Sequence, residues 1–121
     1  MELTQDTRIA KNIITAYREQ VVCVNENEYT QSLILSPDHI QSCAFKKLSD
    51  IKQADLSTLL LDDPEVIIIG CDEGVAQLPG QQLAFFYEKN IGVEVMNIQA
   101  ACRTYNLLAN EGRRVVACLM F

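Results

Sequence analysis

The sequence is poor in the residues that hold metals and in paired cysteines. It has one histidine, His39, and five cysteines, an odd number, of which no two are closer than 16 positions. A zinc site or a disulfide framework needs clustered Cys and His or an even, closely spaced set of cysteines. We therefore expect no metal and five reduced, mainly structural thiols. Such thiols favour a reducing compartment, and we expect the cytoplasm.

The fingerprints of nucleotide cofactors and the signals of membrane insertion are also missing. Neither GxGxxG nor GxxxxGK[ST] occurs, so neither a dinucleotide nor a P-loop nucleotide is expected, and no other cofactor is indicated. The longest apolar runs are far too short to span a bilayer. Residues 1–11 are polar and lack the apolar core of a signal peptide. We expect no membrane insertion.

Basic surface is scarce as well. Sixteen acidic and ten basic side chains leave a net charge of −6, and the densest basic groups are the doublets Lys46-Lys47 and Arg113-Arg114. A field of this sign repels polyphosphates, and a doublet is too short to line a nucleic-acid groove. Nucleic acid is excluded as an expected partner.

The chain does have enough apolar residues for one packed domain. At 121 residues and 49% hydrophobic composition, residues 1–121 are expected to form a single domain. The first half is rich in β-branched and aromatic residues, which predicts an N-terminal β-meander or hairpin. Its strands are expected at 13–17, 20–24 and 29–35, with a weaker strand at 42–48, and its turns at 25–28 and 36–39.

The second half alternates between strand and helix patterns. Strands are expected at 65–70, 93–97 and 114–120, and helices at 54–61, 81–89 and 99–111. Strand, helix, strand, helix, strand with short links predicts a C-terminal βαβαβ unit with parallel strands, hence the α/β class.

Four segments resemble a known family: Pro64–Gly70 (PEVIIIG), Gly92–Met96 (GVEVM), Ala100–Leu108 (AACRTYNLL) and Glu111–Val115 (EGRRV). In order and spacing they are similar to small α/β domains of largely unknown function, which include mitochondrial complex I assembly factor 3 and an adipogenesis-associated protein with a Mth938-type domain. The resemblance implies a three-layer fold with a mixed central sheet and no agreed catalytic activity. The assembly factors of this family act by binding other proteins.

The chain departs from the family pattern at two strand ends. It has Gly70-Cys71-Asp72 where the family commonly has Gly-Thr-Gly, and Met96-Asn97-Ile98 where the family commonly has Met-Asp-Thr. In open α/β sheets, ligands bind outside the carboxyl ends of the parallel strands, which is where both departures fall. The candidate ligand-binding residues are Gly70, Cys71, Asp72, Glu73, Asn97, Arg103 and Asn106.

The chemistry of these candidates is open to two interpretations. Arg103 either receives an anionic group of a ligand or partner, or it pairs with Asp72 or Glu73, while Asn106 ties down a neighbouring loop. Cys71 is expected to be a bystander thiol rather than a nucleophile, because the only histidine, His39, is far away in sequence and the adjacent Asp72 would raise the pKa of the thiol. Its place in a loop predicts that it is the fastest of the five thiols to react with a labelling reagent.

The combined features predict a binding or assembly module that acts on other proteins and has no catalytic residue. The alternative is a small-molecule-binding protein or an enzyme that uses the crevice at the ends of the strands terminating at Gly70 and Asn97. A domain that works only as a homo-oligomer is a third hypothesis, and the oligomeric state is left open.

Overall fold

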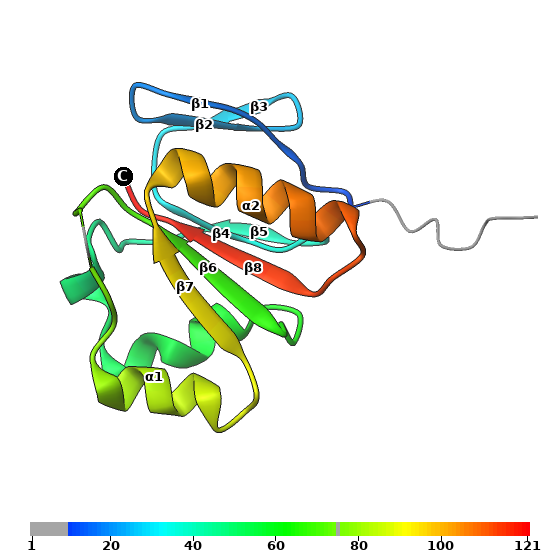
Figure 1. The fold of residues 1–121 in the computed structure, drawn as a ribbon. Helices are drawn as coiled ribbons and strands as arrows, with labels where there is room; N and C mark the ends of the chain where they lie inside the picture. The colour runs from blue at the N-terminus through cyan, green and yellow to red at the C-terminus, as the bar shows by residue number, and fades with distance from the viewer. Residues whose placement is uncertain (1–9, 75) are drawn as a thin grey trace, which may run out of the picture.

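The computed structural model describes residues 10–74 and 76–121, which contain two sheets (Figure 1). The smaller sheet is antiparallel and has the order β1-β2-β3, with β1 at Ile14–Arg18, β2 at Val21–Val24 and β3 at Asn27–Tyr29. Asn25, with φ of +56°, makes the tight turn between β2 and β3. The predicted N-terminal meander is confirmed for these strands.

The larger sheet has five strands in the order β5-β4-β8-β6-β7. Its strands are β4 (Leu33–Leu35), β5 (Ile40–Ser42), β6 (Val66–Gly70), β7 (Gly92–Met96) and β8 (Val115–Leu119). β6 is parallel to β7 and β8, whereas β4 is antiparallel to β5 and β8. The mixed central sheet of an α/β fold is confirmed, with the β6–β8 part forming the predicted βαβαβ unit.

Two predicted strands are wrong in their bounds. The strand expected at 29–35 is divided by Thr30–Ser32, so that β3 belongs to the small sheet and β4 to the large one. The strand expected at 42–48 lies instead at 40–42, directly after the turn at 36–39, where it pairs with β4. The first error arises because β4 pairs with β8, far along the chain, and the second because pairing with β4 in a hairpin, rather than local composition, decides where β5 lies.

Four helical segments connect the strands of the large sheet. The two α-helices are α1 (Gly80–Tyr87) and α2 (Ile98–Asn110), and the two 3₁₀ segments are η1 (Leu48–Asp50) and η2 (Gln53–Leu60). The helix predicted at 54–61 is therefore 3₁₀ rather than α. Its buried side chains, Leu56 and Leu59, are three residues apart, which matches the three-residue turn of a 3₁₀-helix.

Helices cover both faces of the large sheet, and the central strand β8 contributes residues to the hydrophobic core on each face. In Figure 1, α2 and the small sheet lie on one side of the large sheet, and α1 with the 3₁₀ segments lies on the other. Alternate β8 residues point to opposite faces: Val115, Ala117 and Leu119 pack with α2, whereas Val116 and Cys118 pack with the α1 side. Because the sheet is packed on both faces, the ends of its strands, where the candidate residues lie, are held in place.

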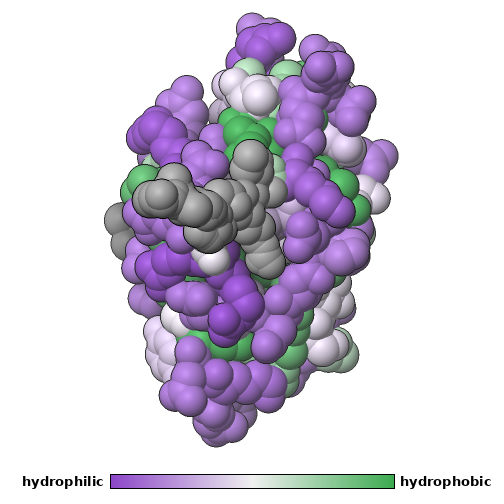
Figure 2. All heavy atoms as spheres, turned by 90° about the vertical axis from the view of Figure 1, so that its right-hand side faces the viewer, coloured by the Kyte–Doolittle hydropathy of each residue, from purple (hydrophilic) through white to green (hydrophobic). Residues whose placement is uncertain are grey.

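Hydrophilic residues cover most of the described surface on the side viewed in Figure 2, and hydrophobic residues there form small, separate areas. Among the described helices, none has the length and apolar content that a bilayer crossing requires.

Candidate functional site

The carboxyl ends of β6 and β7 meet at one edge of the large sheet, beside the start of α2. Gly70 is the last residue of β6 and is buried against the helix: a Cβ placed on it would lie 2.7 Å from the Ala101 Cβ. Cys71 follows, and its backbone N–H donates to the Met96 carbonyl at 3.0 Å. The Cys71 side chain is only 2% exposed and its burial raises the pKa of the thiol. The loop position of Cys71 therefore does not expose its thiol, which removes the basis for predicting that it reacts fastest.

Asp72 is exposed, and its carboxylate is bound to two other elements. Its Oδ1 accepts from the Ile98 backbone N–H at 3.2 Å, which is the first N–H of α2. Its Oδ2 lies 3.5 Å from the Tyr17 hydroxyl on β1. Burial of Tyr17 and the charge of Asp72 together raise the pKa of the phenol, so that Tyr17 stays a neutral donor. Asp72 therefore joins β6, α2 and the small sheet.

Glu73 points to a different part of the molecule from Asp72. Its Oε2 accepts from the backbone N–H of Leu48, the first residue of η1, at 2.7 Å. The two adjacent carboxylates thus cap two separate helical segments. They do not form the close pair that acid–base catalysis by two carboxyl groups would require.

Asn97 completes the N-terminus of α2. Its Oδ1 accepts from the Ala100 N–H at 2.8 Å, and its carbonyl accepts from the Ala101 N–H at 2.9 Å. With Asp72 on Ile98, side chains of the protein satisfy two of the N–H groups that the helix leaves free at its start, those of Ile98 and Ala100. An anionic ligand on these two groups would have to displace the side chains. Both departures from the family pattern, at Asp72 and at Asn97, thus supply acceptors to α2.

A groove of about 290 Å³ runs between β1 and α2, next to this edge. Its walls are formed by Ile14, Thr15, Ala16, Tyr17, Gln99, Cys102, Arg103 and Asn106. Asn106 is half-buried and binds β1 twice, because its Oδ1 accepts from the Ile14 N–H at 2.9 Å and its Nδ2 donates to the Ile14 carbonyl at 2.7 Å. Asn106 thus ties down a strand, β1, rather than the expected loop. Burial raises the pKa of Cys102 to about 11, so its thiol stays protonated in the groove.

Arg103 lies on the exposed wall of the same groove. Within residues 10–74 and 76–121, no carboxylate is at ion-pair distance from its guanidinium. The expected pairing with Asp72 or Glu73 is wrong, since both carboxylates face backbone N–H groups instead. Of the candidates, Asp72, Glu73, Asn97 and Arg103 are exposed, whereas Gly70 and Cys71 are buried and Asn106 is bound to β1.

Tyr17 is the residue of this region that sequence analysis missed. Its ring packs edge-on against Phe121, with centroids 6.2 Å apart, and it lines the groove while its hydroxyl faces Asp72. Strand periodicity predicts that Tyr17 and neighbours two residues away share a face, but it does not reveal what that face meets.

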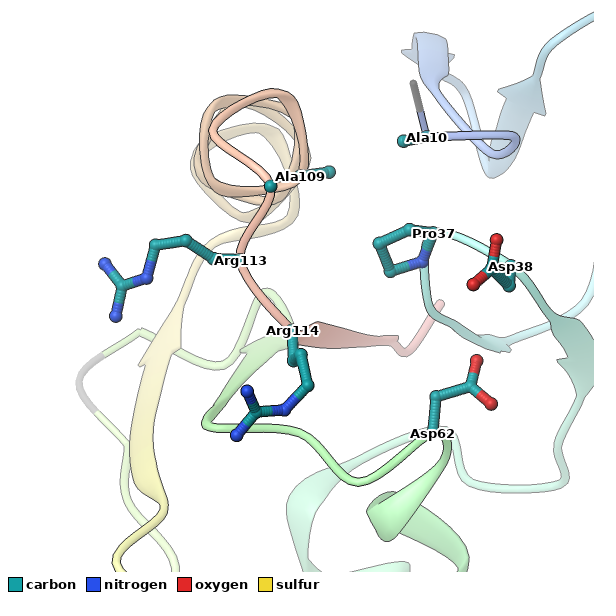
Figure 3. A pocket seen from close by; sticks show the side chains of 8 residues that line it. Ala10, Pro37, Asp38, Asp62, Ala109, Arg113 and Arg114 are labelled. Carbon is teal, nitrogen blue, oxygen red and sulfur yellow. The ribbon is translucent and has the colours of Figure 1, made fainter. Parts of the chain in front are cut away.

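A second cavity, of about 240 Å³, lies at the opposite end of α2 (Figure 3). Asp38 and Asp62 direct their carboxylates into the same space, whereas Arg113 extends away from it. The Arg113 Nε donates to Glu65 Oε2 at 2.8 Å, and the Arg114 Nε donates to the Asp63 carbonyl at 2.8 Å. Both arginines therefore fasten the chain ahead of β6 to the chain ahead of β8.

Beside this cavity, Ser36, His39 and Asp62 form a cluster with the composition of a hydrolase triad but not its geometry. The Ser36 hydroxyl binds Asp62 and also accepts from the His39 backbone N–H at 3.1 Å. The His39 Nδ1 lies 2.7 Å from Asp62 Oδ2. A triad needs the hydroxyl on the histidine ring, and here both groups meet the carboxylate, with Ser36 fully buried. The cluster fastens the β4–β5 turn to the segment before β6.

We expect Asp62→Asn to lower the free energy of unfolding at pH 7 by about 1 kcal/mol, because a charged acceptor of the Ser36 hydroxyl is replaced by a neutral one at a partly exposed site. The Ser36 and His39 contacts lower the pKa of Asp62 below its usual 3.8. A carboxyl with a lowered folded pKa stabilises above its unfolded pKa and loses that effect as pH falls through the folded pKa. The stability of the wild type should therefore approach that of the variant as pH falls through the folded pKa, below 3.8.

Urea unfolding at pH 7 and pH 3 measures both effects. Asp63→Asn is the control, because Asp63 has the same left-handed backbone and its hydrogen bonds to described residues, with the Leu60 carbonyl and with Arg114, are made by its backbone groups. Equal losses for the two variants at pH 7 would show that the Asp62 carboxylate has no special role.

Among the described residues, no three His, Cys, Asp or Glu side chains are grouped so that they could hold a metal ion.

The chain is similar to several known proteins in sequence and in structure. A 13 kDa major membrane protein of Francisella tularensis subsp. holarctica is 33% identical over 99 residues, which is 80% of each chain. Human NADH dehydrogenase (ubiquinone) 1 alpha subcomplex assembly factor 3 is 28% identical over 129 residues, covering 98% of this chain and 70% of the human one. The solution structure of a Bordetella pertussis protein, a Mth938-like domain, matches with a TM-score of 0.80 and 29% identity, covering 99% of this chain and 92% of that one.

These similarities confirm the resemblance to the complex I assembly factor and to Mth938-type domains. The family model described as "Protein of unknown function (DUF498/DUF598)" matches residues 14–120. The chain belongs to this DUF498/DUF598 family.

Proposed function

We propose that this chain is a protein-binding module that helps to build a larger assembly, with the exposed ridge of α2 as its contact surface. The ridge consists of Gln99, Arg103 and Leu107, which follow one another at four-residue spacing and are all exposed. The single observation that supports this surface best is the exposure of Leu107, 59%, one helical turn from Arg103. An exposed apolar side chain beside an arginine without an ion-pair partner among the described residues is typical of a contact surface.

The same residues indicate which side chains a partner would present to this surface. Arg103 suits a carboxylate, Leu107 suits an apolar side chain, and the groove beside them has room for a side chain of the partner. The name of the human relative, an assembly factor, supports an assembly role. Five free cysteines support a reducing compartment, for which we propose the cytoplasm.

The alternative, an enzyme or small-molecule binder at the strand ends, has less support. Asp72 and Glu73 would be its acid and base, and each already accepts a hydrogen bond from a helical N–H group. A ligand there would compete with the folding of α2 and η1.

We expect Arg103→Glu to weaken partner capture about tenfold, as reversal of a charge within a contact commonly does. The variant should melt close to the wild-type temperature, since substitution of an exposed side chain without a strong contact changes stability by less than about 0.5 kcal/mol. Capture from the native cell by tagged wild type and variant, quantified by mass spectrometry, gives the first value. A thermal melt gives the second.

Lys46→Glu makes the same change of charge at an exposed lysine of the β5–η1 segment and is the matched control. Equal loss of partners in both variants would assign the effect to net charge. Unchanged capture by Arg103→Glu would remove α2 as the contact surface.

A further inference from the structure

β1 is an edge strand of the small sheet, and its free edge faces α2 across the groove of about 290 Å³. Glu19 and Gln20, with φ of +50° and +69°, form the two-residue turn that joins β1 to β2. The pair that flanks this turn, Arg18 and Val21, is therefore hydrogen-bonded across the hairpin. Because such pairs alternate along an antiparallel ladder, the N–H and C=O of Tyr17 point away from β2, along the free edge.

Ile14 shows what this free edge binds. Its N–H and C=O also point away from β2, and the Asn106 amide bonds both of them, at 2.9 Å and 2.7 Å. Ile14 and Tyr17 are three positions apart rather than two because the register shifts between Ile14 and Ala16. The Asn106 side chain, with one donor and one acceptor, thus occupies the edge as the backbone of a further strand would. Among the described side chains, none bonds the corresponding groups of Tyr17.

The free edge has an open end and an occupied end. Asp72 links the start of α2, at Ile98, to Tyr17 near the end of β1, whereas Asn106, two turns later, binds Ile14 at the start of β1. α2 therefore runs antiparallel to β1. A strand added antiparallel to β1 would pass Tyr17 and bring its carboxyl end toward Asn106. It would have to end there, because Asn106 already bonds both groups of Ile14.

Arg103 lies on α2 between the two ends of this edge. Of the residues that line the groove, it alone carries a charge, and it has no ion-pair partner in the part of the chain that the structure describes. Gln99, also exposed, precedes it by one helical turn, roughly 6 Å, which is the length of about two residues of extended chain. A chain whose terminal carboxylate met Arg103 would therefore pass Gln99 and Tyr17 two residues earlier.

We propose that the groove binds the C-terminal end of a partner protein as an extended segment, which pairs with the Tyr17 backbone and places its terminal carboxylate on Arg103. This assignment rests on the proposed function, because it names the part of the partner that α2 contacts. Backbone pairing to a sheet edge and capture of a terminal carboxylate are both established modes of peptide recognition. A terminal carboxylate fits better than a carboxylate side chain, since the added chain must end before Asn106.

Octapeptides with random sequence and a free carboxyl end, immobilised through their N-termini, are the probe. A selected peptide is then made as the free acid and as the C-terminal amide, and the affinity of each is measured by fluorescence anisotropy. The acid should bind at least about tenfold more tightly, because only the acid forms a charge-assisted hydrogen bond with the guanidinium. Arg103→Gln should weaken binding of the acid about tenfold and leave binding of the amide unchanged. Lys46→Gln, at an exposed lysine of the β5–η1 segment, is the control and should change neither affinity.

Amide hydrogen exchange of the unmodified chain tests the backbone pairing. The Ala16 N–H, which faces Cys23 in the hairpin, should be protected with or without peptide. The Tyr17 N–H should exchange fast in the free protein and about tenfold more slowly with saturating peptide.

Several results would overturn this assignment. They are failure to select any peptide, equal affinities of acid and amide, equally tight binding of an amidated peptide with an internal glutamate, and unchanged exchange at Tyr17. Loss of captured partners by Arg103→Glu would in each case still support the proposed function. Unchanged capture by that variant would overturn the proposed function itself.

Discussion

Gly70→Ala should destabilise the protein by roughly 3 kcal/mol, the upper part of the range for overpacking a core. An added Cβ would lie 2.7 Å from the Ala101 Cβ, 3.0 Å from Leu119 Cδ2 and 3.4 Å from the Ile98 Cα. Two of these atoms belong to α2 and cannot rotate away, so the helix would have to lift from the sheet. Loss of dispersion contacts along the helix would follow. Urea unfolding of the purified variant measures the loss.

Gly80→Ala is the matched control, because a Cβ added to this helical glycine would have no atom within 4 Å of it. We expect it to be neutral or to stabilise by up to about 1 kcal/mol, since alanine is the better helix former. Ala101→Gly should restore part of the stability of Gly70→Ala, with a coupling free energy of at least about 1 kcal/mol in a double-mutant cycle. Simple additivity would show that the close approach of β6 and α2 is not what limits residue 70.

The second half of the fold was predictable because its signals are local. The apolar residues at positions 66–69, bounded by Pro64-Glu65 and Gly70, predict a strand buried on both faces, and β6 occupies Val66–Gly70. The apolar spacing of α2 likewise predicts its buried face, on which Ala101, Cys102 and Tyr105 lie. Neither prediction needs knowledge of a distant partner.

The first half was less predictable because its strands are short and one of them, β4, has a distant partner. β4 has three residues and pairs with β8, more than eighty positions later. Nothing in residues 29–35 indicates that the strand must end at Tyr29 and that another must begin at Leu33. The same limitation applies to the site, where Tyr17 meets Asp72 only through the tertiary fold.

Asn106→Ala should lower the free energy of unfolding by about 2–4 kcal/mol. The side chain satisfies both the N–H and the carbonyl of Ile14, at 2.9 Å and 2.7 Å, where β1 lies against α2. Removal of both bonds leaves two partly buried backbone groups without their partner, each costing about 1–2 kcal/mol. Asn110→Ala, at an exposed position one turn later, should change stability by less than about 0.5 kcal/mol. Amide hydrogen exchange at Ile14 should accelerate in the first variant only.

Asn106→Asp tests the direction of the two bonds. An aspartate can still accept from the Ile14 N–H, but when ionised it cannot donate to the Ile14 carbonyl and places a charge against that oxygen. Its folded pKa should therefore rise above the unfolded value of about 3.9, so the variant is destabilised at pH 7 and recovers as pH falls through the folded pKa. The difference in stability from wild type should accordingly be smaller at pH 4 than at pH 7.

If Asn106→Ala melted at the wild-type temperature, β1 would not depend on this side chain. Asn106 would then be available to a ligand in the groove beside Arg103.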